Sequence, residues 1–310
     1  MKVAIIVFSP SGHTLEVAKM MEKSMTNKGM KVQLLDITRN EKIFKEDKMG
    51  QYLKEKIEPH DLICVGGPVY AGHFEGNAMN IIKALPYPDK IWGKLAIPFV
   101  TYGGLHSSIA LMEAGKLFHK RRRINIAGMK IASFHTLSTT LPFKINENKP
   151  GAEALPVIEE LVKRITDIAD KDSQKLRVYD SQKLRVYENV KDVRNSFSYA
   201  FIIERLIFRF LSQEFFHGKS KPAEIDYDKC IGCGICAKRC PVNIFEMIDE
   251  KPKKTNMNSH CILCAECFHN CPVDAISYDY LSKSKKRLSH MLKKNRMESP
   301  QSAVYPLQDV

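Results

Sequence analysis

The chain has 310 residues, of which 44% are hydrophobic and 27% are charged, and its formal net charge is +13. This length allows two domains, and these fractions are those of an ordinary soluble protein rather than of a fibrous or wholly disordered chain. The basic excess raises the question of nucleic-acid binding. No recognisable binding module accompanies it, so we do not expect nucleic acid as a partner.

The N-terminal stretch predicts a phosphate-binding loop. Residues 2–8 are a short β-branched apolar run, which favours a buried parallel strand over a helix or a signal peptide. Residues 9–14 (SPSGHT) follow, and apolar residues at helical spacing continue to Gly29. In this arrangement the loop N–H groups, the hydroxyls and the positive helix end point at one anion. The alternative is a plain strand-to-helix turn with Thr14 as the N-cap.

The pattern of alternating strands and helices continues to residue 171. Apolar runs predict further strands over 31–36, 60–66, 94–102 and 124–134. Helical patterns follow over 45–57, 77–85, 107–122 and 152–171. Such alternation predicts an α/β domain built on a doubly wound parallel sheet. The loops at 67–72 and 101–105 carry glycines that let a backbone approach a ligand, with ordinary βα turns as the alternative.

Residues 1–171 resemble a flavodoxin. The first loop matches the flavodoxin pattern Ser/Thr-x-Ser/Thr-Gly-x-Thr, although flavodoxins are usually acidic and this stretch is basic. The resemblance implies a five-stranded sheet of order 2-1-3-4-5 with FMN at the switch point between strands 1 and 3. It further implies that two tyrosines are candidates to stack on the flavin ring, Tyr70 and Tyr102. The FMN-binding residues it implies are Ser9, Ser11, Gly12, His13, Thr14, Pro68, Val69, Tyr70, Ala71, Gly72, Thr101, Tyr102, Gly103 and Gly104.

Residues 172–222 are interpreted as a helical linker. The octapeptide DSQKLRVY occurs twice in tandem at 172–187, and an eight-residue period cannot keep both copies on one helix face. We therefore expect a duplication tolerated in a solvated segment. Residues 197–216 are very apolar, but Glu204, Arg205 and Arg209 would lie near the middle of a bilayer. We expect no transmembrane helix here but one packed on the domains, with contact at a membrane surface as the alternative.

The motif C-x-x-C-x-x-C-x-x-x-C-P occurs twice, at 230–241 and 261–272, and accounts for eight of the nine cysteines. Three thiolates at this interval suit a loop wrapped around an iron–sulfur cube. Gly232 and Gly234 permit turns with positive φ. The alternative is structural zinc, which takes four ligands per ion and has no use for the third cysteine. The remaining cysteine, Cys64, lies in an apolar run and is expected to be an inert core thiol.

Residues 223–280 resemble a two-cluster bacterial ferredoxin, a small α+β domain. The resemblance implies that the fourth cysteine of each run binds the cluster of the other run. One 4Fe–4S cluster is then held by Cys230, Cys233, Cys236 and Cys271. The other is held by Cys261, Cys264, Cys267 and Cys240. Residues 281–310 are a basic tail, expected to be a solvated helix that frays from Ser299, with a docking arm as the alternative.

The two parts together resemble the flavodoxin–ferredoxin fusion proteins of anaerobes. The resemblance implies an iron–sulfur flavoprotein that relays electrons between FMN, two 4Fe–4S clusters and external redox proteins. The alternative is an FMN-dependent reductase of a small quinone or nitro acceptor. We find no catalytic triad, carboxylate pair or Rossmann fingerprint. Cluster thiolates favour a reducing, cytoplasmic setting. The basic surface favours partners with acidic docking surfaces, and the oligomeric state is left open.

Overall fold

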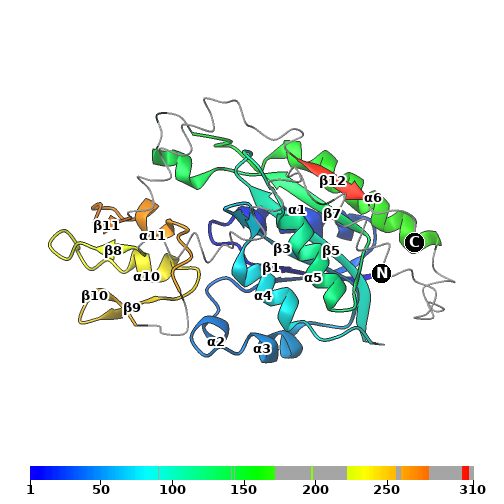
Figure 1. Ribbon diagram of the computed structural model, residues 1–310, viewed down its shortest axis with the longest axis horizontal. Coiled ribbons are helices and arrows are strands. Elements are labelled where there is room, and N and C mark those ends of the chain that lie inside the picture. The colour runs from blue at the N-terminus through cyan, green and yellow to red at the C-terminus, as the bar shows by residue number, and fades with distance from the viewer. Residues whose placement is uncertain are drawn as a thin grey trace.

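The structure is a computed structural model that describes residues 1–89, 91–140, 142, 144–171, 197, 222–255, 260–278 and 302–306. A larger part contains the first 171 residues and a smaller part contains residues 222–278 (Figure 1). The tandem duplication and nearly all of the apolar stretch 197–216 lie outside the described residues. The predictions made for them therefore stay predictions.

Five parallel strands form the centre of the larger part. They are β1 (Lys2–Val7), β2 (Lys31–Asp36), β3 (His60–Tyr70), β5 (Trp92–Tyr102) and β7 (Ala127–Ala132). Their order across the sheet is β2-β1-β3-β5-β7, which matches the predicted order 2-1-3-4-5 for the parallel strands, but the whole sheet has eight strands rather than the predicted five. The apolar residues of β1 are buried on both faces, as the continuous hydrophobic run requires of a central parallel strand.

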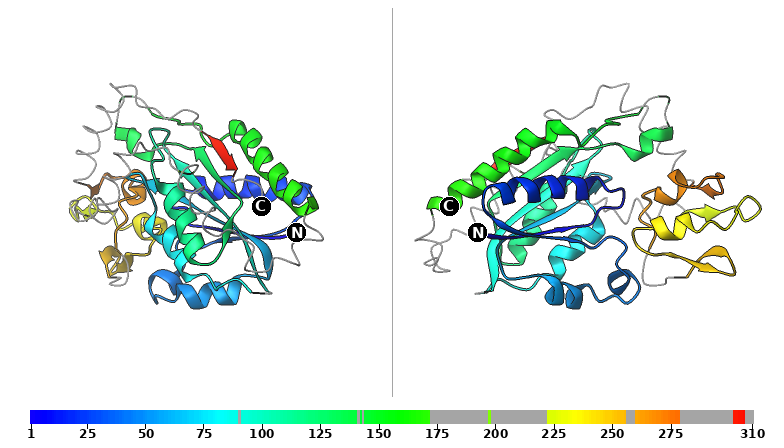
Figure 2. Two further views of the ribbon diagram at one scale, coloured as in Figure 1. Left: turned by 45° about the vertical axis from the view of Figure 1, so that its right-hand side comes forward. Right: turned by 180° about the vertical axis from the view of Figure 1, so that it is seen from behind.

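Helices cover both faces of this sheet and divide the interior into two cores. One face is covered by α1 (His13–Asn27) and α6 (Leu155–Lys171), the latter preceded by the short η2 (Ala152–Ala154). The other is covered by α2 (Glu41–Phe44), α3 (Met49–Lys56), α4 (Gly76–Ala84) and α5 (Ala110–Lys120) (Figure 2). The single helix expected over 45–57 is wrong at its start, because α2 and α3 are separate.

The sheet has an edge strand that the sequence analysis missed. β12 (Ala303–Pro306) pairs antiparallel with β7, with Val304 opposite Met129. The expectation of a frayed tail is therefore wrong for these residues. Two short strands, β4 (His73–Phe74) and β6 (Ile124–Asn125), complete the sheet. A four-residue apolar stretch carries too little periodicity to be recognised without its partner strand.

The smaller part consists of two short antiparallel strand pairs and two short helices. β8 (Glu224–Ile225) pairs with β11 (Ile276–Ser277), and β9 (Phe245–Ile248) pairs with β10 (Lys251–Lys254). The helices are α10 (Ile235–Arg239) and α11 (Glu266–His269). Among the described residues, no helix has both the length and the apolar character needed to cross a bilayer.

The smaller part lies at the end of the sheet where the parallel strands finish (Figures 1 and 2). In an open α/β sheet this carboxyl edge is where ligands bind, at the point where the strand order reverses. Here that point lies between β1 and β3. The position of the smaller part therefore brings it to the predicted cofactor edge of the larger part.

Candidate cofactor sites

Hydrogen bonds of Ser9 fix the conformation of the first loop. The Ser9 hydroxyl accepts a hydrogen bond from the backbone N–H of Leu15 at 2.9 Å, and the Ser9 N–H donates to the Thr38 hydroxyl at 2.8 Å. Gly12 precedes the helix with φ 89°, a left-handed conformation that strains residues with a Cβ. The N-cap is therefore Gly12 and not Thr14, which was the structural alternative to a phosphate loop.

This loop leaves backbone donors available for an anion. The N–H groups of Ser11, His13 and Thr14 have no acceptor among the described residues. They lie at the start of a fifteen-residue helix, whose dipole favours negative charge. The His13 ring instead packs edge-on against Phe134, with centroids 6.1 Å apart. Burial lowers the pKa of His13, opposed by the Glu16 charge, which suits a backbone rather than a charged side-chain role.

The first and third predicted loops are joined by a buried hydrogen bond. The hydroxyl oxygens of Thr14 and Thr101 lie 2.7 Å apart, and both side chains are almost fully buried. This contact fixes the spacing between the phosphate loop and the end of β5. The residues that follow Thr101, namely Gly103 and Gly104, are thereby held near the same edge as Gly12.

The second loop is a tight hairpin. β3 runs through Pro68, Val69 and Tyr70, and the chain turns at Ala71 and Gly72 into β4. Both turn residues have positive φ, 52° and 85° respectively. The Gly72 carbonyl accepts from the N–H of Ile109 at 3.1 Å, which connects the hairpin to the segment after β5. Tyr70 is half-buried and stays a candidate for contact with a ring.

Tyr102 lies in the interior. Its side chain is 3% exposed, and its ring centroid is 5.8 Å from the Lys130 ammonium nitrogen. A ring enclosed to this degree has no free face for stacking. We therefore retain the backbone of residues 101–104, rather than the Tyr102 ring, as the part of this loop that faces a cofactor.

Two polar atoms beside the third loop fit a bound ligand. Nδ1 of His135 and Oγ of Ser108 are buried and have no hydrogen-bond partner among the described residues. The His135 ring also packs directly on Gly103, where an added Cβ would lie 2.2 Å from the ring. Burial lowers the pKa of His135 to about 4, so the ring is neutral at pH 7. Buried polar atoms usually have partners, so these two suit a ligand with polar ring edges such as FMN.

One group of cysteines lines a hollow in the smaller part. Cys230, Cys233, Cys236 and Cys271 all border it. These are the three cysteines of the first run and the fourth of the second, which is the crossed set that the ferredoxin resemblance implies. The Cys271 sulfur accepts a hydrogen bond from the N–H of Ala275 at 3.2 Å, the kind of contact that favours a thiolate.

The other four cysteines are the first three of the second run and Cys240, the fourth of the first run. The Tyr278 hydroxyl lies 3.4 Å from the Cys267 sulfur and 3.8 Å from that of Cys261. Cys240 and Cys267 have raised pKa values, in part because the charge of Cys261 lies close to both. Burial is the main cause, and it raises the pKa of Cys267 to about 12. Metal binding would therefore have to displace protons from these thiols.

The cysteine spacing favours a multi-iron group over a single ion. Within the described residues, no three His, Cys, Asp or Glu side chains converge as one metal ion requires. A zinc knuckle would draw four sulfurs to about 2.3 Å from one point. A cube offers one iron to each of four sulfurs, so four cysteines per cluster at this spacing fit it. Cys64, in contrast, is fully buried in the sheet, and burial raises its pKa, as expected for an inert core thiol.

The sequence analysis missed the helices inside the motifs. The third cysteine of each run lies on a short helix, Cys236 on α10 and Cys267 on α11. Gly232 and Gly234 have the predicted positive φ, 73° and 71°. The equivalent positions of the second run adopt the same conformation without glycine. Leu263 has φ 57° and Ala265 has φ 63°.

Comparison with known proteins agrees with this division of the chain. Residues 223–278 match the family model described as a 4Fe-4S dicluster domain. Residues 1–132 match the family model described as NADPH-dependent FMN reductase. The chain joins a flavodoxin-like domain to a two-cluster ferredoxin domain. From here on these are called the flavodoxin-like domain and the ferredoxin domain.

Known relatives match short stretches of this chain. A ferredoxin of Thermococcus litoralis is 41% identical over 56 residues, which are 18% of this chain and 93% of that protein. Pyruvate synthase subunit PorD of Methanothermobacter marburgensis is 61% identical over 31 residues, 10% of this chain and 38% of the subunit. An uncharacterised protein of Methanocaldococcus jannaschii is 33% identical over 66 residues, 21% of this chain and 24% of that protein. The chain thus spans only about a quarter of that relative.

Solved structures align with the flavodoxin-like domain at low identity. A flavodoxin from the domain Archaea has 19% identity and a TM-score of 0.36, covering 55% of this chain and 98% of its own. The apo form of an NADH:FMN oxidoreductase has 15% identity and a TM-score of 0.40, covering 53% of this chain and 89% of its own.

Proposed function

We propose that this protein is an iron–sulfur flavoprotein that relays electrons between FMN, two 4Fe–4S clusters and external redox proteins. The observation that carries the proposal is that the ferredoxin domain lies against the carboxyl edge of the flavodoxin-like sheet. FMN exchanges one or two electrons and each cluster exchanges one, so the combination can divide a two-electron delivery into single steps. The chain's own task is then to hold the centres close together and to tune their surroundings.

The residues proposed to hold FMN come from three loops. The N–H groups of Ser11, His13 and Thr14 would bind the phosphate, with Ser9 and Gly12 shaping the loop. The hairpin Pro68–Gly72 and the backbone of residues 101–104 would border the flavin ring. His135 Nδ1 and Ser108 Oγ supply polar atoms beside the third loop. These assignments rest on position and on unmet hydrogen-bonding capacity.

The residues proposed to hold the clusters are the two crossed sets of cysteines. Cys230, Cys233, Cys236 and Cys271 border one hollow, which supports the first set. The sulfurs of Cys261 and Cys267 lie beside the same Tyr278 hydroxyl, which supports the second. Burial raises the pKa of Cys264 and of Cys267, and the charge of Cys240 is among the further causes for both. All eight ligands are thiolates, which favours low reduction potentials.

The partners are proposed to be redox proteins with acidic docking surfaces. The net charge of +13 would attract them at low ionic strength, and salt would weaken the attraction. We place the protein in the cytoplasm, because exposed cluster ligands such as Cys233 need a reducing environment.

Anaerobic purification with iron, sulfide and flavin analysis tests the proposal. We expect about eight iron and eight sulfide ions per chain and one FMN. A reductive titration should bleach the absorption of the clusters and of the flavin in the same protein. A preparation that binds no flavin, or whose flavin stays oxidised while the clusters are reduced by a redox protein, would refute it.

A second candidate function is reduction of a small acceptor at the flavin. The match of residues 1–132 to a family of FMN reductases favours it. The ferredoxin domain covers the same edge of the sheet, which argues against free access of an acceptor. Steady-state turnover of a quinone or nitro compound with NADPH as donor would support this candidate. Turnover only with a reduced redox protein would support the relay.

A further inference from the structure

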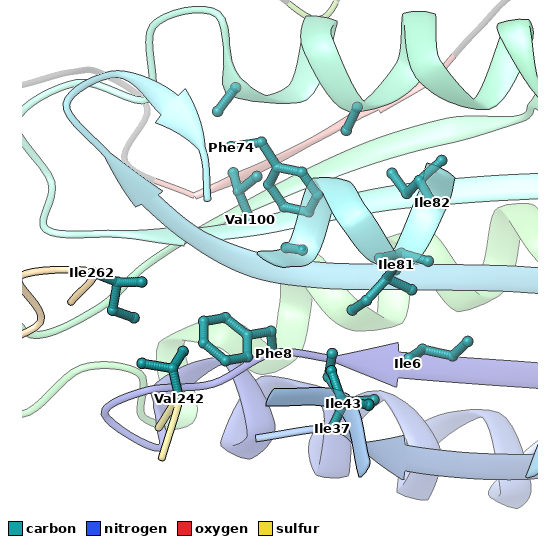
Figure 3. Close-up of a cluster of buried hydrophobic side chains, with 14 of the residues drawn as sticks. Ile6, Phe8, Ile37, Ile43, Phe74, Ile81, Ile82, Val100, Val242 and Ile262 are labelled. Atoms are coloured by element: carbon teal, nitrogen blue, oxygen red, sulfur yellow. The ribbon is translucent and has the colours of Figure 1, made fainter. Parts of the chain in front are cut away.

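The ferredoxin domain has two halves with the same motif, and they do not have the same surroundings. Each half begins Cys-Ile, so Ile231 and Ile262 occupy equivalent positions. Ile231 is 63% exposed, whereas Ile262 is 7% exposed and packs in a cluster that includes Phe8 of the flavodoxin-like domain. Figure 3 shows Ile262 and Val242 near the Phe8 ring. At this position the first half of the ferredoxin domain therefore faces solvent, whereas the second half faces the sheet of the flavodoxin-like domain.

The segments after the fourth cysteines show the same asymmetry. Pro241 and Val242 are buried, and the Pro241 carbonyl accepts from the backbone N–H of Arg39 at 2.8 Å. The equivalent Pro272 is exposed. The Asn243 side chain donates to the Arg39 carbonyl at 2.8 Å, which gives Arg39 two hydrogen bonds to the ferredoxin domain.

Two further polar contacts join the domains. The Thr139 hydroxyl lies 3.3 Å from Nδ1 of His269, which is on α11 of the second half. Lys45 forms an ion pair with Glu246 at 3.1 Å. The contacts therefore reach from the loop after β2 to the 3-10 helix η1 (Thr136–Thr140), across the carboxyl edge of the sheet.

Most of these contacts lie beside one set of cysteines. Pro241 directly follows Cys240 and Ile262 directly follows Cys261, whereas His269 is two residues from both Cys267 and Cys271. Cys240, Cys261, Cys264 and Cys267 are here called the inner group. Cys230, Cys233, Cys236 and Cys271 are called the outer group. Cys233 of the outer group is exposed, and its equivalent Cys264 is half-buried.

We propose that the inner group holds the cluster next to the flavin, and that the outer group is the port through which external redox proteins exchange electrons. This inference rests on the proposed function and adds the order of its centres. When bound, each cluster would exchange one electron at a time and FMN one or two. The outer group would hold the cluster that external redox proteins reduce or oxidise, and the inner group would hold the cluster between that one and the flavin.

The two cysteine runs also differ in sequence in a way that agrees with this order. Three positions that are small in the first run are larger in the second: Gly232 becomes Leu263, Gly234 becomes Ala265, and Ala237 becomes Phe268. Leu263 is buried in the apolar cluster that the two domains share, and Phe268 packs against it. The backbone at Leu263 and Ala265 is left-handed, which is an unfavourable conformation for residues with a side chain. Both residues lie in the half of the domain that meets the sheet. Large side chains at these positions add apolar contact area to this side of the domain.

Flavin emission in the holoprotein tests the order. Electron transfer to a nearby cluster quenches flavin fluorescence, and quenching weakens steeply with distance. Two variants each remove the second cysteine of one run. Cys264→Ala changes the inner group and Cys233→Ala changes the outer group. Iron and sulfide analysis establishes that each has lost one cluster. We expect a several-fold longer flavin lifetime in Cys264→Ala and an unchanged lifetime in Cys233→Ala.

The outcomes separate this inference from the proposed function. A longer lifetime only in Cys233→Ala would overturn the order and leave the relay intact. Unchanged lifetimes in both variants, with flavin bound and one cluster lost, would overturn the relay as well. Longer lifetimes in both variants would overturn the order if one cluster remains in each.

If either cysteine substitution causes the loss of both clusters, a second pair of variants provides the test. Ile262→Asp places a charge in the apolar contact between the domains, and Ile231→Asp makes the same change at the equivalent exposed position. Both keep all eight cysteines. We expect Ile262→Asp to lengthen the flavin lifetime with iron content unchanged, and Ile231→Asp to leave it unaltered. Equal effects of the two substitutions would overturn the order.

Discussion

Glu75 should make the flavodoxin-like domain less stable as pH rises. Its carboxylate is 1% exposed and caps α4, accepting from the N–H groups of Asn77 and Ala78 at 2.7 and 3.0 Å. Burial raises the pKa of Glu75 from 4.5 to about 7, against the opposing effect of these hydrogen bonds. Between pH 4.5 and about 7 the folded state therefore binds a proton that the unfolded state has lost. Proton linkage then lowers the free energy of unfolding across this window.

The magnitude follows from the two pKa values. For 4.5 in the unfolded and about 7 in the folded state, the contribution of Glu75 falls by about 2 kcal/mol between pH 5.5 and pH 8. His135 acts in the opposite direction, because burial lowers its pKa to about 4. Its protonation destabilises the folded state as pH falls from about 6.5 to 4. The wild-type profile contains both effects, so the test needs a difference between variants.

Glu75→Gln removes the titration and keeps one oxygen that can cap α4. Urea unfolding followed by fluorescence of Trp92, the only tryptophan, reports on the domain that contains Glu75. Relative to wild type, the variant should gain about 2 kcal/mol in free energy of unfolding on going from pH 5.5 to pH 8. Glu58→Gln, at an exposed ion pair with Lys31, is the control and should show no such change. A constant difference between wild type and Glu75→Gln at the two pH values would refute the reasoning.

Three further substitutions test the fold and the proposed FMN site. Thr14→Val leaves the buried Thr101 hydroxyl without its partner, and should cost about 1–3 kcal/mol in urea unfolding and weaken FMN binding measured by fluorescence titration. Gly66→Ala places a Cβ 2.1 Å from the Phe99 ring and should cost about 1–3 kcal/mol or more, so an unchanged melting temperature would contradict it. Val304→Asp puts a charge on the buried side of β12 and should lower the free energy of unfolding by at least about 2 kcal/mol; equal stability would mean that β12 contributes nothing.

The sequence predicted features that depend on local pattern. The order of the five central strands followed from alternating elements together with the flavodoxin resemblance, because parallel strands need crossover helices. The positive φ of Gly232 and Gly234 followed from the turn that three closely spaced thiolates require. The crossed assignment of the cysteines stays a prediction, and the four cysteines of the first set border one hollow.

Features that depend on distant partners could not be predicted. The buried Arg123 donates to the Gly93 and Pro86 carbonyls, which lie about thirty or more residues earlier in the chain. Burial lowers the pKa of Arg123 to about 10. Tyr102 ends β5 as expected, but nothing in its own segment indicated the Lys130 ammonium beside its ring. Each of these features depends on a contact between residues that are far apart in the sequence or lie on neighbouring strands. The hydrophobic periodicity of a single segment carries no information about such contacts.

The strand β12 has a consequence for how the ferredoxin domain is tethered. Phe197, before that domain, is buried against Gly128 of β7, and Tyr305, after it, pairs with the same Gly128. The chain thus contacts β7 both before and after the ferredoxin domain, so this domain is tethered at both ends to one strand. A single protease cut between these two contacts would leave it attached, and its local concentration at the sheet would exceed that given by one tether. Two cuts would be needed to release it.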